Sequence, residues 1–93
     1  MPEHDLKVWP VYFDAIVSGA KPWEVRINDR DFNRWDILHL REWSQMRQTY
    51  TGRSIKMVVS YLVPIPDGQQ VGMTITPAGG IPVVLMDGEP VGG

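Results

Sequence analysis

Strict alternation of apolar and polar residues over positions 23–28 is the feature that most constrains the fold of this chain. Side chains of a β-strand point alternately to its two faces, so the pattern predicts a strand with one apolar and one polar face. We expect the apolar face, which includes Trp23, to pack in the core. The polar face carries Glu24, Arg26 and Asn28, whose spacing of roughly 6 to 7 Å allows contact with one small planar ligand. A solvated strand face is the alternative interpretation.

The remaining pattern predicts one short helix and several short strands. Pro10 suits a first helical turn and Gly19 suits the position after a last turn, so residues 10–18 are expected to be helical. Residues 50–53 supply a turn signal, and residues 67–72 read as a loop by composition. The expected strands beyond the first are residues 4–9, 35–43, 55–63 (stopped by Pro64 and Pro66) and 81–86, with 73–76 a shorter candidate.

Short elements in a chain of 93 residues favour a single α+β domain. We expect a curled mixed β-sheet that approaches a small barrel, with one or two short helices. Residues 1–87 are assigned to this domain. Residues 88–93 are expected to be a frayed tail, because five of the eight prolines and seven of the nine glycines follow residue 60.

The composition limits the cellular location that we expect for the protein and the kinds of site that it can hold. The chain has no cysteine, so disulfides and thiolate metal sites are excluded. No apolar run approaches the roughly 20 residues of a membrane span, and the first residues do not resemble a secretion signal. We therefore expect a cytoplasmic protein without a membrane partner, and we expect no cofactor.

The charge distribution disfavours a broad cationic surface. The net charge is −2, and all nine lysines and arginines lie at or before Lys56. Nine bases against eight acids give +1 up to Ser60, and three acids without a base give −3 beyond it. Tight nonspecific binding of duplex nucleic acid is therefore disfavoured, and a local pocket is favoured.

Polar residues near the alternating strand are the candidate site. Lys21 can add a cation beside Glu24 and Arg26, and Lys7 and His4 on the first strand could reach the same edge if the strands pair. Asp29 and Arg30 follow in a polar loop that is equally compatible with a solvated turn. The tryptophans Trp9, Trp35 and Trp43 could belong to the core or stack on a ligand. His4 and His39 lack metal-ligand spacing, so no metal is expected, and no Ser-His-Asp arrangement is evident.

A series of short motifs runs from residue 4 to about residue 61. They are His4-Asp5-Leu6-Lys7, Tyr12-Phe13, Ser18-Gly19, Lys21, Glu24-Val25-Arg26, Asn28-Asp29-Arg30-Asp31-Phe32, Asp36-Ile37-Leu38, Leu40-Arg41-Glu42-Trp43 and Tyr50-Thr51-Gly52-Arg53. This combination resembles the ASCH family of the PUA-like superfamily, and within it the DUF3850 group of small phage and bacterial proteins. The resemblance implies the same curled fold. Because the family usually has a glycine where this chain has Trp35, we expect the turn there to be built differently.

The resemblance implies a module that binds a nucleotide or an unpaired RNA base, with RNA or a nucleotide as partner. The ligand-binding candidates are His4, Lys7, Lys21, Glu24, Arg26, Asn28, Asp29, Arg30 and Trp43. One alternative is an amidohydrolase of an acylated nucleoside such as N4-acetylcytidine, with Lys21 and Glu24 as catalytic candidates, although Glu24 stands where that branch has a threonine. Another is a phage-type inhibitor that binds a host protein or sequesters a signalling nucleotide.

Overall fold

The protein is a curled sheet with a single helix over the described residues. The computed structural model describes residues 2–90. Its elements in chain order are β1 (Glu3–Val8), α1 (Pro10–Ser18), β2 (Trp23–Ile27), β3 (Ile37–Ser44), β4 (Thr49–Pro64), β5 (Gln70–Pro77), β6 (Val84–Met86) and β7 (Glu89–Pro90). The predicted small α+β fold with a curled mixed sheet is confirmed at this level.

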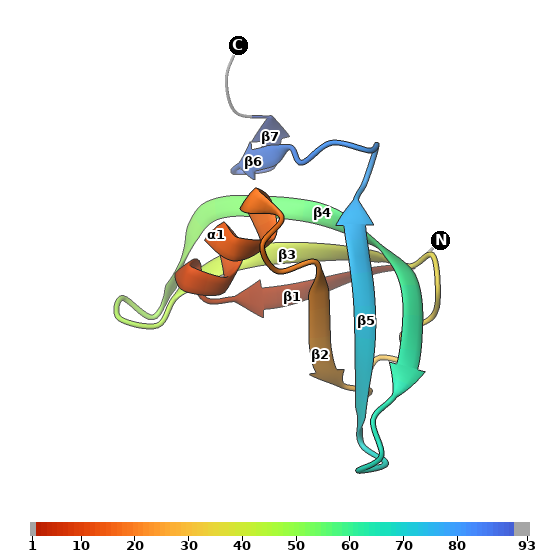
Figure 1. The fold of residues 1–93 in the computed structure, drawn as a ribbon. Coiled ribbons are helices and arrows are strands. Elements are labelled where there is room, and N and C mark those ends of the chain that lie inside the picture. Colours follow the sequence, from red (N-terminus) through yellow and green to blue (C-terminus); the bar gives the residue numbers. More distant parts are fainter. Residues whose placement is uncertain (1, 91–93) are drawn as a thin grey trace.

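The sheet runs in the order β1-β3-β4-β5-β2, with β1 and β3 parallel and the other neighbours antiparallel. Figure 1 shows the long β4 arching across the molecule. Its first part pairs with β3 and β6, and its later part pairs with β5. Because one strand belongs to both parts of the sheet, the sheet curls into a half-barrel with β1 and β2 at its two ends.

Helix α1 has the bounds that its end signals predict. Pro10 occupies the first turn, and Gly19 adopts φ 86° in the left-handed region that glycine tolerates. The Gly19 amide donates to the Ile16 carbonyl at 3.2 Å. Phe13 and Ile16 are buried, so this face of the helix packs into the core.

The core fills the concave side of the sheet. Every strand from β1 to β5 except β2 contributes buried apolar side chains, and α1 and the loop after β2 add the rest. They are Leu6, Val8, Phe13, Ile16, Phe32, Leu38, Leu40, Ile55, Met57, Val59, Val71, Met73 and Ile75.

The orientation of β2 is opposite to the one predicted. Trp23 is 47% exposed, whereas Glu24 is only 4% exposed. Glu24 and Arg26 pair with the buried residues Met73 and Val71 of β5, so the polar face of β2 looks into the concave side. The apolar face, expected in the core, lies on the outer side, where no helix covers it. Alternation separates two faces of a strand, but pairing with β5 decides which of them faces inward.

The turn before the central strand was also misplaced. Residues 50–53 lie inside β4, and the chain reverses between β3 and β4 over residues 45–48. Gly52 has φ 96° and marks an irregularity in the register with β3, so the glycine signals a distortion of the strand and not a turn. The central strand therefore starts six residues earlier than residue 55.

The last third is more ordered than its composition predicts. Strand β5 begins at Gln70, within the segment expected to be a loop, because Asp67 caps a tight turn by accepting from the amides of Gln69 and Gln70. Strand β6 lies within the predicted residues 81–86. Strand β7 pairs with β6 in the segment expected to fray, and the remaining residues of that predicted tail, 91–93, lie outside the described part of the chain.

Trp35 occupies a backbone conformation that normally favours glycine. Its φ is 76°, and its amide donates to the Val59 carbonyl at 2.7 Å. The turn was expected to be built differently because glycine is missing at this position, but a left-handed residue is still used. Trp35 adopts the left-handed conformation itself, and its ring packs against the Arg34 guanidinium at 4.4 Å.

Candidate ligand-binding pocket

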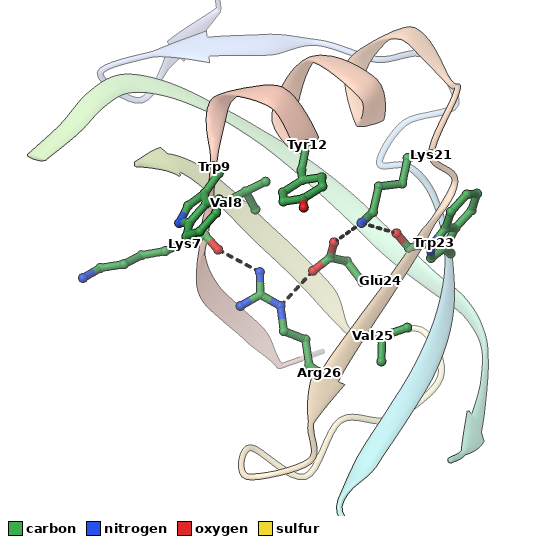
Figure 2. Close-up of a pocket in the computed structure, with 9 residues that line it drawn as sticks. All are labelled: Lys7, Val8, Trp9, Tyr12, Lys21, Trp23, Glu24, Val25 and Arg26. Atoms are coloured by element: carbon green, nitrogen blue, oxygen red, sulfur yellow. Dashed lines mark hydrogen bonds and ion pairs between the residues drawn. The ribbon is translucent and has the colours of Figure 1, made fainter. Parts of the chain in front are cut away.

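A pocket of about 550 Å³ opens on the concave side, between the end of β1, the start of α1 and strand β2 (Figure 2). Polar side chains from β2 and from Lys21 just before it meet aromatic side chains from the helix start. The lining residues are Lys7, Val8, Trp9, Tyr12, Lys21, Trp23, Glu24, Val25 and Arg26.

A buried carboxylate organises the polar side of the pocket. Lys21 Nζ lies 2.6 Å from Glu24 Oε1, and Arg26 Nε lies 2.8 Å from Glu24 Oε2. Lys21 also donates to the Trp23 carbonyl at 3.0 Å. Each oxygen of Glu24 accepts from one cation, so the carboxylate fixes the positions of Lys21 and Arg26.

Arginine side chains bridge the two ends of the sheet near this pocket. Arg26 donates to the Lys7 carbonyl at 2.7 Å, and Arg30 donates to the Asp5 carbonyl. These carbonyls lie on β1, which pairs through backbone ladders only with β3. Guanidinium groups therefore tie β1 to β2 and its following loop where no backbone ladder does.

Three half-exposed aromatic rings stand around the cations. Trp9, Tyr12 and Trp23 are 49%, 49% and 47% exposed. Trp9 and Tyr12 are stacked at 6.3 Å, and the Lys21 amine lies 5.7 Å from the Tyr12 ring and 5.9 Å from the Trp23 ring. Tyr12 was not among the predicted site residues, but its separation of three residues from Trp9 at a helix start places both on one face.

The local charge of this pocket is positive. Two cations, Lys21 and Arg26, face one carboxylate, Glu24, which leaves a formal charge of +1; Lys7 lines the pocket with its carbonyl group, and its amine points away toward Trp43 (Figure 2). An anionic group would complement this charge, and the aromatic rings offer flat surfaces for a planar group. The pocket is therefore suited to a ligand that joins an anion to a ring.

The other predicted ligand-binding residues lie outside this pocket. His4 is bonded to Asp36 Oδ2 at 2.8 Å and contacts Phe32 edge-on, because β1 pairs with β3 and not with β2. Asn28 accepts from the Phe32 amide at 3.0 Å and thus stabilises the loop after β2.

Asp29, Arg30 and Trp43 are neighbours of the pocket without lining it. Asp29 and Arg30 line an adjacent hollow of about 350 Å³ that shares Arg26 with it. Trp43 holds the Lys7 amine 3.9 Å from its ring centre. The structure therefore brings Lys21, Glu24 and Arg26 together with the Lys7 carbonyl, and it places the remaining predicted residues outside this pocket.

A second chain of polar side chains crosses the sheet, and no sequence motif predicted it. Asp5 Oδ1 lies 2.9 Å from His39 Nδ1, and His39 Nε2 lies 2.9 Å from Ser54 Oγ. The order of groups is that of a Ser-His-Asp triad. Ser54, however, is 4% exposed in a strand paired on both sides, so no substrate carbonyl can reach it. The bonds join β1, β3 and β4.

One group of metal-ligand type occurs among residues 2–90. Oxygen and nitrogen atoms of Glu3, Asp5 and His39 lie within 4.8 Å of one another. Both His39 nitrogens are hydrogen-bonded, and Glu3 pairs with Lys56 at 3.2 Å. These partners would have to be displaced before a metal ion could bind.

A buried ion pair fixes α1 to the sheet on the side away from Glu24. Glu42 accepts from Arg53 at 2.6 and 2.9 Å and from the Thr51 hydroxyl at 2.6 Å. Arg53 also reaches Asp14 on α1 at 3.0 Å. The bond from Arg53 holds the pKa of Glu42 below its ordinary value despite burial, and the same bond raises the pKa of Arg53.

These features define a class: a small α+β protein whose half-barrel opens a cationic pocket with aromatic walls. The chain belongs to the family described as Domain of unknown function (DUF3850), whose model matches residues 3–75. It is 34% identical over 64 residues to a protein of Escherichia phage P2 described as an uncharacterized 12.9 kDa protein in the GpA 3′ region. The match covers 69% of this chain and 57% of the relative, so the chain spans less than two thirds of that protein. Among the described residues, no helix is long and apolar enough to span a membrane.

Proposed function

We propose that the pocket binds a nucleotide, presented as an unpaired base of RNA. The observation that carries the proposal is the enclosure of two ion-paired cations, Lys21 and Arg26, by half-exposed aromatic rings. Single-stranded nucleic acids are bound through this pairing of stacking surfaces with cations that contact phosphate. The resemblance to ASCH and PUA-like domains agrees with the proposal.

The proposed roles differ from those expected from the sequence. Glu24 positions Lys21 and Arg26, because it is 4% exposed and each of its oxygens accepts from one of these cations. Lys21 and Arg26 contact the phosphate through their remaining N–H groups. Trp9 and Tyr12 contact the base or the sugar.

Amide hydrolysis is less well supported than binding. A lysine that acts as base or nucleophile needs a free lone pair, whereas Lys21 forms an ion pair with Glu24 at 2.6 Å. The position that holds threonine in the amidohydrolase branch holds Glu24, whose oxygens are both occupied. The pocket residues therefore offer cations and rings to a ligand but no activated nucleophile.

Calorimetric titration with short single-stranded RNA tests the proposal. Lys21→Met should weaken binding by roughly 1 to 3 kcal/mol, the size of a charge-assisted hydrogen bond. Lys56→Met is the matched control, because Lys56 pairs with Glu3 away from the pocket and its loss should leave affinity unchanged. Equal effects of both variants would contradict the proposal. Release of cytidine from N4-acetylcytidine, abolished by Lys21→Met, would favour the enzyme instead.

A further inference from the structure

An apolar face covers the outer side of the sheet over β2, β5 and β4. Trp23, Val25 and Ile27 of β2 point outward there. Pairing registers place Thr74 and Gly72 of β5 beside Trp23 and Val25, and Tyr61 and Val63 of β4 beyond them. We call this set the outer face: Trp23, Val25, Ile27, Tyr61, Val63, Gly72 and Thr74.

The middle of the outer face is formed by β5 around Gly72. A side chain at Gly72 would meet Ile65 at 3.4 Å and Val63 at 3.8 Å, so these two residues lie close over the glycine. The strip between the rows of β2 and β4 therefore carries only the short Thr74 side chain and the Ile65 and Val63 side chains that lie over Gly72. Such a face accepts another sheet at the usual spacing of about 10 Å without cutting into the backbone.

We propose that the outer face binds a second copy of this chain, sheet against sheet. The seven residues of the face carry no charge, so two copies meet there without like-charge repulsion, and a strongly charged partner would find no complement. Arg34 is the charged residue at its rim, and it is engaged with Trp35 at 4.4 Å and with the Ser60 carbonyl at 2.7 Å. This arrangement matches an interface with an apolar centre and a polar rim.

The exposed area agrees with a dimer contact. Trp23, Tyr61 and the adjacent Trp35 are each about half exposed. Aromatic side chains bury roughly 150 to 250 Å² each, so these three alone supply about 300 Å², and the aliphatic residues add to it. The exposed apolar area of the outer face and Trp35 therefore approaches the roughly 800 Å² that each partner buries in a standard interface. It is also larger than the area exposed by single apolar residues scattered over a monomer surface.

Sedimentation equilibrium of the intact chain from micromolar to near-millimolar concentration tests this inference. The wild-type chain should form a dimer. Val63→Glu should weaken dimerisation on the order of 100-fold, because it would bury an unpaired charge at the interface. Val63 does not line the proposed nucleotide pocket, so failure of the dimer would leave the proposed function untouched.

Ile81→Glu is the matched control, because Ile81 is 67% exposed in the chain before β6 and outside the outer face. It should dimerise as the wild type does. If circular dichroism shows that Val63→Glu is misfolded, Tyr61→Glu is assessed in its place. A wild-type chain that stays monomeric throughout the range, or folded face variants that dimerise as tightly as Ile81→Glu, would overturn the inference.

Discussion

In β2 the apolar side chains lie outside the core, and a charged side chain is buried. Trp23 was predicted to be buried, but it is 47% exposed and borders both the pocket and the outer face. Glu24, which was predicted to face outward, is buried between two cations. At this scale the residue types were informative about which side chains share a face, but not about the environment of each face.

Exposure at Trp23 leads to a quantitative prediction. Trp23→Ala should lower the free energy of unfolding of the monomer by only about 1 to 2 kcal/mol, because about half of the Trp23 surface stays in water after folding. Phe13→Ala is the control: Phe13 is fully buried, and its loss should cost about 3 to 5 kcal/mol. Urea denaturation at low protein concentration measures both. Similar losses in the two variants would show that Trp23 is a core residue after all.

Trp35 leads to a second prediction at the same scale. A left-handed conformation costs a non-glycine residue about 1 to 2 kcal/mol. Trp35→Gly should therefore be more stable than Trp35→Ala by about 1 kcal/mol, whereas glycine is normally the less stable of the two in extended structure. Urea denaturation of the two variants gives the difference. The normal order, with alanine more stable, would refute the left-handed turn.

Elements were predictable where their signals are local. Pro10 and Gly19 gave both ends of α1, and the alternation of residues 23–28 gave β2. The β3–β4 turn was missed because it contains neither glycine nor proline, and Gln48 takes the left-handed position at φ 54°. The length of β4 was missed because it depends on pairing with three other strands, which no local pattern reports.

The link between α1 and the sheet should be sensitive to acid. The pKa of Glu42 is lowered by the hydrogen bond from Arg53. Its stabilising contribution is therefore present above the unfolded-state value near 4.5 and is lost as pH falls through the lower folded-state value. Glu42→Gln should consequently be less stable than the wild type at neutral pH, and the difference should shrink below pH 4.5. Urea denaturation across this range checks it, and a constant difference would contradict it.

The whole molecule combines a weakly charged surface with a locally positive pocket. Arg30 and Arg53, which sequence alone would offer to phosphates, are engaged with the Asp5 carbonyl and with Glu42 and Asp14. The candidate site was therefore predictable in part. Glu24 and Arg26 lie on one strand and Lys21 lies just before it, so their proximity follows from the sequence. Trp9 and Tyr12 come from the start of a helix that only the fold brings close to this strand.

The dependence of RNA binding on salt follows from this distribution. Lys21 and Arg26 are the cations whose charged ends lie at the pocket, and Arg30 lines the adjacent hollow. With two or three phosphate contacts, a plot of the logarithm of the binding constant against the logarithm of the salt concentration should have a slope of about −1 to −2 for a single strand. Duplex DNA should bind weakly, because the domain lacks a broad cationic face. Titrations at two salt concentrations measure the slope, and a steep slope with equal affinity for all sequences would indicate binding to the backbone alone.

The most direct measurement of the central claim is the NMR spectrum of the four tryptophan indole N–H groups during titration with single-stranded RNA. Trp9 and Trp23 line the pocket, whereas Trp35 and Trp43 do not, so the chain carries its own internal control. Binding in the pocket predicts that the Trp9 and Trp23 signals shift to saturation together and that the Trp35 signal stays in place. Shifts confined to Trp35 or Trp43, or no shift of any indole at high RNA concentration, would contradict it.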